Sequence, residues 1–442
     1  MTKVNDAVHA AISPLRAWVS VGILTLLYAC SMLDRTIISM LIGPMKADLG
    51  VGDFQLSLLV GLAFGGFYIL CGIPLGWIAD RFPKRPLIFA GISIWSLGAT
   101  LCGFAGSYGQ MFASRALVGA GEAAISPAAY SIMSSSFSKG RLALPLSIYG
   151  LGSPVGSAVG MALAGLIVTW AEHGGAAGLP ILDGMRSWQM VFLLTGAPGL
   201  LIAWLAFTLP EPPRQPSCRA GGSLKRFVSS NRVLIASVFA AFALSAVASY
   251  NIVVWSPEYM VRSFGWSRAQ VGGAIGILTL VAPVISHLIT GFLADGFFSR
   301  GMLDAHVRLY MGMLVLAVPF VFLAYFSSSA AAFLVGLFGM LLLVLPAQAL
   351  AAAVLQLSVP PDLRGRITGA YLAFVNLAGL TLGPSLVGFL NQYVFGEQAI
   401  GLSSATVVLS AIVITFLLLI VALPKVRAAI ASRAQVIVEA RQ

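Results

Sequence analysis

Apolar runs that are each long enough to cross a lipid bilayer as a helix dominate this chain. A hydrocarbon core of about 30 Å requires roughly 20 apolar helical residues. Only 9% of the residues are charged, whereas a soluble domain carries about a quarter. The sequence therefore predicts an all-α integral membrane protein with twelve transmembrane helices. We expect them near residues 17–42, 54–79, 86–105, 109–133, 142–170, 188–209, 233–259, 271–295, 307–325, 330–357, 367–394 and 405–423.

A ten-residue pattern that closes the second run returns at the end of the eighth. Gly76 to Arg85 reads GWIADRFPKR, and Gly291 to Arg300 reads GFLADGFFSR. The recurrence predicts two six-helix bundles. A Gly four residues before an Asp shares its helix face, so a neighbouring helix can approach closely while the Asp stands at the membrane edge. The residues expected to act in gating are Gly76, Asp80, Arg81, Arg85 and Asp295. The alternative is that both carboxylates are ordinary solvated helix ends.

The basic residues indicate how the chain is oriented. With a cytoplasmic N-terminus, twenty of the 26 Lys and Arg fall on the cytoplasmic side, Arg35 and Arg115 fall within the membrane, and only Lys46, Arg186, Arg262 and Arg268 fall outside. Such a bias predicts that both termini are cytoplasmic. No Asn-x-Ser/Thr sequon occurs, which fits the inner (plasma) membrane of a bacterium.

A Pro-rich and then basic stretch that begins P-E-P-P-R separates the two halves, because proline restricts continuation of the preceding helix. The expected organisation is a cytoplasmic N-terminus at 1–16, a first bundle at 17–209, a cytoplasmic linker at 210–232, a second bundle at 233–423 and a cytoplasmic C-terminus at 424–442.

Composition and motifs argue against several function classes. The net charge of +11 comes from basic residues in short loops, with no dense basic tail, so a nucleic-acid partner is not expected. We find no metal-ligand spacing, P-loop or nucleophile elbow, so neither an enzyme nor a bound cofactor is predicted. The expected partners are a small amphipathic or organic-anion substrate and membrane lipids, the expected energy source is a proton gradient, and the expected state is a monomer.

Four ionisable residues are expected at membrane depth, where such groups are functional candidates by default. Asp34 and Arg35 are in the first run, and Arg115 and Glu122 are in the fourth. Arg115 and Glu122 lie two helical turns apart and therefore share one face. Asp34 and Arg35 point in different directions, so one of them can reach the fourth helix. We interpret Asp34, Glu122 and Arg115 as a proton-coupling cluster and Arg35, Arg115 and Glu122 as substrate contacts. The alternative is a static ion-pair network.

The second half supplies polar and aromatic residues instead of charges. Tyr250, Asn251 and Trp255 in the seventh run, Gln348 in the tenth and Asn376 in the eleventh are candidate substrate contacts. Interhelical hydrogen bonds are the alternative. The glycines and prolines of 150–160 and 379–388 are expected to allow bending and close helix crossing.

These motifs together resemble the major facilitator superfamily over nearly the whole chain. Gly76 to Arg85 resembles the superfamily signature between helices two and three, although Pro83 replaces a frequent Gly and the second copy lacks an Arg after Asp295. The segment from Arg115 to Glu122 resembles the fourth-helix motif associated with proton coupling. The resemblance implies a secondary transporter that works by alternating access.

Within the superfamily, Asp34-Arg35, the fourth-helix stretch RALVGAGEAA and the stretch PDLRGR before the eleventh run resemble the Spinster group. That group includes exporters of sphingosine-1-phosphate and lysophospholipids. The resemblance implies an amphipathic lipid substrate, with Arg35 and Arg115 near its headgroup and Asp34 and Glu122 taking up protons. The anion:cation symporter group, which carries organic acids, shares the first-helix Asp-Arg and a similar fourth helix. A non-transporting receptor on the same fold is a further alternative.

Overall fold

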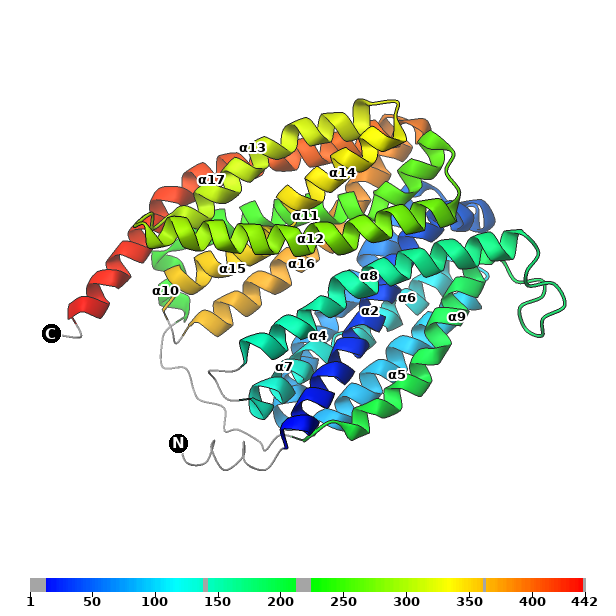
Figure 1. The fold of residues 1–442 in the computed structure, drawn as a ribbon, viewed down its shortest axis with the longest axis horizontal. Helices are drawn as coiled ribbons and strands as arrows, with labels where there is room; N and C mark the ends of the chain where they lie inside the picture. The colour runs from blue at the N-terminus through cyan, green and yellow to red at the C-terminus, as the bar shows by residue number, and fades with distance from the viewer. Residues whose placement is uncertain (1–12, 138–141, 212–223, 361–362, 440–442) are drawn as a thin grey trace. The chain divides into compact units, whose positions relative to one another are not determined.

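The computed structural model describes residues 13–137, 142–211, 224–360 and 363–439, apart from the side chains of a few helical residues. Within these ranges the chain forms helices and no β-strand (Figure 1). The chain divides into two compact units. Unit 1 comprises Met1–Ser217 and Met260–Leu280, and unit 2 comprises Cys218–Tyr259 and Val281–Gln442.

Unit 1 is built mainly from the helices of the first half. In chain order they are α2 (Pro14–Leu49), α3 (Asp53–Leu58), the π-helix η1 (Leu59–Ala63), α4 (Phe64–Arg81), α5 (Lys84–Gly103), α6 (Tyr108–Glu122), α7 (Ile125–Ser136), α8 (Ala143–Glu172), α9 (Ser187–Ile202) and the 3₁₀-helix η3 (Ala203–Thr208).

The helices of the second half follow. They are α10 (Leu224–Ser230), α11 (Arg232–Phe264), α12 (Arg268–Ser299), α13 (Ala305–Phe326), α14 (Ala330–Val344), α15 (Ala347–Ser358), α16 (Arg364–Phe389), η4 (Leu390–Val394), η5 (Glu397–Ala399) and α17 (Ile400–Glu439). The C-terminal end of α11 and the N-terminal part of α12 belong to unit 1. The units therefore differ from the predicted bundles 17–209 and 233–423 by this hairpin tip.

Helices occupy all twelve predicted spans, and eleven of the spans in the described chain are long and apolar enough to cross a membrane. The remaining one, predicted at 109–133, is split into α6 and α7 at Ala123 and Ala124. Pro127 gives the reason, because it has no N–H to donate to the carbonyl of Ala123 and its ring would clash there. The break directly follows Glu122. The tenth predicted span, 330–357, is likewise divided, into α14 and α15 at Leu345 and Pro346.

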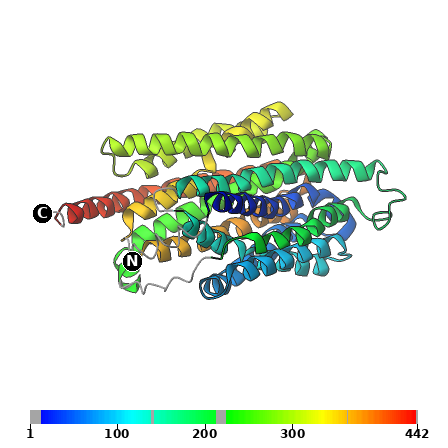
Figure 2. The ribbon, with the colours of Figure 1, turned by 60° about the horizontal axis from the view of Figure 1, so that its bottom comes forward.

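Small residues let the unit 1 helices pack at short distances. A Cβ at Gly156 of α8 would overlap the Ala29 carbonyl of α2, and Gly152 and Gly160 meet α2 in the same way one turn to either side. The two helices lie side by side in Figures 1 and 2. Further along α8, a Cβ at Gly165 would overlap the Arg268 carbonyl at the start of α12. Three of the glycines expected to permit close crossing, Gly152, Gly156 and Gly160, therefore form the α2–α8 interface.

We expect Gly156→Ala to destabilise unit 1 by about 1–3 kcal/mol, because the added Cβ would force α2 and α8 apart. Gly150→Ala is the matched control in the same helix. A Cβ there meets nothing within 4 Å, so this change should be neutral or slightly stabilising through helix propensity. Thermal unfolding of the two variants in detergent makes the comparison, and equal melting temperatures would contradict the packing argument.

Candidate functional site

The four predicted intramembrane charges come together in unit 1, on α2 and α6. Nε of Arg35 donates to Oε2 of Glu122 at 2.6 Å. Asp34, the neighbour of Arg35, turns elsewhere and accepts from the indole of Trp95 on α5. One residue of the Asp34-Arg35 pair therefore reaches the α6 cluster, as the sequence suggested.

These charges are withdrawn from solvent to different degrees. Asp34, Arg115 and Glu122 are 2%, 1% and 2% exposed, whereas 19% of the Arg35 side chain remains accessible. Among the described residues, Oδ1 of Asp34, Oε1 of Glu122 and Nε of Arg115 have no hydrogen-bond partner. Buried groups with unused bonding capacity are costly and occur mainly where function requires them. A proton could bind to either carboxylate oxygen, and an anion could accept a hydrogen bond from Nε of Arg115.

Aromatic rings support the two guanidinium groups. Cζ of Arg35 lies 4.8 Å from the ring centroid of Phe64 and 4.7 Å from that of Tyr68. Cζ of Arg115 lies 5.3 Å from the same Phe64 ring. A ring face attracts a cation by up to about 2 kcal/mol when water is excluded. Phe64 therefore holds both arginines beside Glu122, and only Arg35 presents accessible surface.

A second aromatic group extends from this region across α2, α7 and α8. The rings of Tyr28 and Tyr149 stack at 4.8 Å, and Tyr130 meets Tyr149 edge-on at 5.6 Å. Tyr149 is buried, whereas Tyr130 is 52% exposed. Sequence reasoning missed these tyrosines and Trp95, because nothing in their spacing distinguishes them from ordinary membrane aromatics.

Close helix contacts hold the cluster in register. A Cβ at Gly119 of α6 would overlap the Phe64 carbonyl of α4, and one at Gly121 would overlap the Trp95 backbone of α5. Gly119 and Gly121 thus place Glu122 against α4, which carries Phe64 and Tyr68. They also place it against α5, which carries Trp95, the partner of Asp34.

The second-half candidates have varied surroundings in unit 2. Nδ2 of Asn251 donates to the Ser404 carbonyl at 3.1 Å, and Nε1 of Trp255 donates to the Pro384 carbonyl at 3.1 Å, with both residues fully buried. The interhelical alternative therefore describes these two contacts. Tyr250 packs against Gly379 of α16, where a Cβ would lie 2.6 Å from its ring. Gln348 is exposed and Asn376 half-buried.

The predicted gating residues are only partly described. Gly76 lies in α4 with open space around the position of a Cβ, and Asp295 is exposed near the end of α12. Nε of Arg85 donates to the Leu209 carbonyl at 2.5 Å, and the backbone N–H groups of Lys84 and Arg85 donate to Glu211 at 2.6 and 3.1 Å. The side chains of Asp80 and Arg81 lie outside the described residues.

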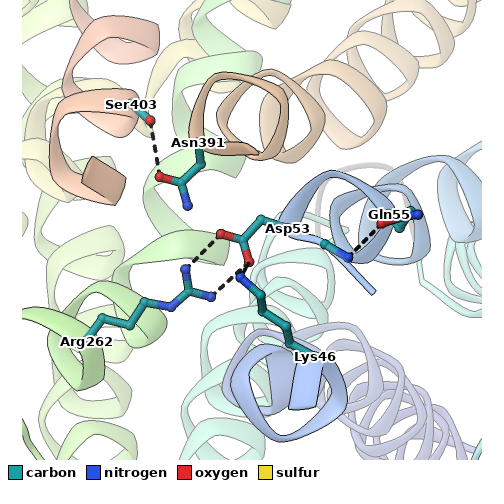
Figure 3. A network of polar contacts seen from close by, with 7 residues as sticks. Lys46, Asp53, Gln55, Arg262, Asn391 and Ser403 are labelled. Atoms are coloured by element: carbon teal, nitrogen blue, oxygen red, sulfur yellow. Dashed lines mark hydrogen bonds and ion pairs between the residues drawn. The ribbon is translucent and has the colours of Figure 1, made fainter. Parts of the chain in front are cut away.

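An unpredicted ion-pair network joins α2, α3 and α11 within unit 1 (Figure 3). Asp53 is fully buried at the start of α3, and its carboxylate accepts from Arg262 at 2.8 and 3.0 Å and contacts Nζ of Lys46 at 3.0 Å. Arg262 comes from the end of α11. Two of the four basic residues predicted outside thus share one carboxylate. In unit 2, Ser403 donates to Asn391 at 3.4 Å (Figure 3).

The other two basic residues that were predicted to lie outside also have partners in unit 1. Arg186 lies 3.8 Å from the Asp48 carboxylate, and Trp188 donates to the same group at 2.7 Å. Arg268 donates to the Met40 carbonyl at 2.5 Å. These four exceptions to the charge bias are therefore engaged in contacts within the protein.

Comparisons with known proteins agree with this architecture. A family model described as Major Facilitator Superfamily matches residues 24–381. The crystal structure of a bacterial homolog to the human lysosomal transporter Spinster, inward-facing and unoccupied, aligns with a TM-score of 0.76 at 22% identity, covering 95% of this chain and 98% of that chain. At this identity the structural likeness establishes the fold.

Sequence relatives fall in several transporter groups. An MFS-type efflux pump of Mycolicibacterium smegmatis is 27% identical over 406 residues, or 88% of each protein. A D-galactonate transporter of Escherichia coli O6:H1 is 23% identical, covering 66% of this chain and 70% of the relative. The sphingosine-1-phosphate transporter SPNS2 of Danio rerio is 26% identical, covering 58% of this chain and 50% of the relative. The resemblance to the superfamily and to Spinster proteins is confirmed.

Proposed function

The chain belongs to the Major Facilitator Superfamily and is a multi-pass membrane transporter, not an enzyme; from this premise we propose that it moves an amphipathic, anionic, lipid-like substrate by proton-coupled alternating access. The observation that carries the proposal is the Arg35–Glu122 pair at 2.6 Å, in which the cation keeps accessible surface and the carboxylate does not.

The surroundings of Arg35 support the substrate class. Its guanidinium can form two parallel hydrogen bonds to a carboxylate or phosphate. The rings of Phe64 and Tyr68 lie against it, and the tyrosines on α2, α7 and α8 add further apolar area. A site with one accessible cation and aromatic walls favours a molecule with a single anionic group and an apolar body.

The coupling step follows from competition for Arg35. While Glu122 is ionised it occupies Nε of Arg35. A proton on Glu122 weakens that pair and frees the guanidinium for the anionic group of the substrate. Proton binding and substrate binding then favour each other by the same factor, because such coupling is reciprocal. Proton and substrate would consequently occupy the protein together and cross together.

The proposal is tested in proteoliposomes that contain a pH-sensitive dye. We expect lysophospholipids or sphingoid phosphates to evoke proton movement that depends on the protein, measured against protein-free liposomes because amphiphiles can themselves leak protons. No protein-dependent response to any single-chain lipid would contradict the proposed substrate class.

A second candidate is proton-coupled transport of a small organic acid. The similarity to a D-galactonate transporter favours it, and Arg35 could bind a sugar-acid carboxylate equally well. A response to hydrophilic organic acids and not to single-chain lipids would select this alternative. Binding of either substrate without transmembrane movement would indicate the receptor alternative.

A further inference from the structure

We propose that Trp95 is a positioning residue for Asp34: its indole N–H holds one carboxylate oxygen and sets the pH at which Asp34 takes up a proton. The proposal deepens the proposed function and rests on it, in that it assigns Asp34 to the coupling step. Trp95 lies on α5, is 2% exposed, and donates from Nε1 to Oδ2 of Asp34 on α2.

The hydrogen-bonding groups of Trp95 and Asp34 make their contact favour one protonation state of the carboxylate. An indole has one N–H and no acceptor, so it can only donate. Asp34 is 2% exposed, and its other oxygen has no partner among the described residues. A donor stabilises an ionised carboxylate more strongly than a neutral one. Trp95 therefore favours the proton-free form of Asp34 in a setting where water contributes little.

The backbone of Trp95 connects this contact to Glu122. A Cβ at Gly121 would overlap the Trp95 backbone, and one at Gly91 would lie 2.9 Å from the Gly121 carbonyl. Residue 121 directly precedes Glu122. Trp95 thus touches α6 beside one carboxylate with its backbone and binds the other carboxylate with its side chain. A displacement of α6 relative to α2 would be transmitted to the hydrogen bond at Asp34.

No other group near Asp34 donates a hydrogen bond to it within the described part of the chain. Those within electrostatic range are Cys30 on α2, Cys102 on α5, and Arg115 and Glu122 on α6. Arg35, the next residue in sequence, is bound to Glu122. Trp95 is the only hydrogen-bond donor to the Asp34 carboxylate within the described part of the chain.

The test is Trp95→Phe, which keeps an aromatic ring and removes the N–H. We expect the pH of half-maximal transport to rise by about one unit, since a hydrogen bond to a charged group is lost and the charged form becomes less favourable. The same upward shift is expected in an infrared titration of the Asp34 carboxyl band, identified as the band that Asp34→Asn removes. Trp95→Met, with a flexible side chain, provides a second donor-free variant if the Phe variant does not fold.

Trp188→Phe is the matched control. Trp188 is also fully buried in unit 1, and its indole donates to another α2 carboxylate, Asp48, at 2.7 Å. The Trp188→Phe variant should show the same pH dependence of transport, and the same infrared titration of Asp34, as the wild type. An unchanged Asp34 band in the Trp95 variants, or an equal shift in Trp188→Phe, would overturn the inference. A wild type that moves no protons would overturn the proposed function, while the infrared shift would still decide the role of Trp95.

Discussion

Glu122→Gln and Asp34→Asn are each expected to reduce gradient-driven transport to the level of protein-free liposomes while the protein stays folded. Both amides keep the shape of the carboxylate but cannot exchange a proton. In Glu122→Gln the ion pair to Arg35 at 2.6 Å is lost, so substrate binding no longer depends on protonation at this position. The measurement is substrate uptake into proteoliposomes with and without an imposed pH gradient.

Substrate exchange without a gradient separates coupling from binding. We expect Glu122→Gln to retain exchange of labelled for unlabelled substrate, since Arg35 remains available. Asp304→Asn provides the control, because Asp304 is a buried carboxylate in unit 2 that pairs with Arg308 at 2.9 Å away from the cluster. The Asp304→Asn variant should show the same gradient-driven transport as the wild type. Normal gradient-driven transport by both cluster variants would support the static ion-pair alternative instead.

Asp53→Asn is expected to destabilise the protein by about 3 kcal/mol, because it leaves two cations around a buried site that has lost its charge. The expected loss of unfolding free energy is not larger, because the side chains of Lys46 and Arg262 are 21% and 20% exposed and can turn toward water. Asp53 also begins α3, where a negative charge is favoured by the helix dipole. Unfolding by sodium dodecyl sulfate in mixed micelles measures the change in free energy.

Asp48→Asn is the matched control for this network. Asp48 lies on the same segment as Lys46, but its carboxylate is 35% exposed and its distance to Arg186 is 3.8 Å. A partly exposed pair of this kind contributes about 0–1 kcal/mol. Equal destabilisation by the two substitutions would mean that the buried Asp53 network contributes no more to stability than the partly exposed Asp48–Arg186 pair.

The main features of the fold followed from the sequence because membrane helices are constrained by length and apolarity. All twelve spans and their approximate bounds were anticipated on that basis. The break in the fourth span was not, since a hydropathy pattern does not register the effect of Pro127 on the Ala123 carbonyl. The assignment of the α11–α12 tip to unit 1 was also missed, because it depends on contacts such as Asp53 with Arg262 between residues far apart in sequence.

The candidate site was predicted in part for the same reason. Charges inside a membrane are rare, so Asp34, Arg35, Arg115 and Glu122 stood out, and helical spacing placed two of them on one face. Trp95 could not be recognised, because its role depends on the direction of one N–H. Asn251 and Trp255 were named as cavity candidates from composition alone, and their donors prove to be used between helices.

The tip of α11 and α12 within unit 1 has a consequence for biosynthesis. Asp53 and Lys46 leave the ribosome long before Arg262, and Gly165 is made before the Arg268 backbone that packs on it. The first six spans can therefore insert in the membrane in order, but unit 1 acquires its last contacts only after residue 280 has been synthesised. A nascent chain arrested between residues 210 and 259 would hold an incomplete unit 1, with the Asp53 carboxylate lacking its bidentate partner.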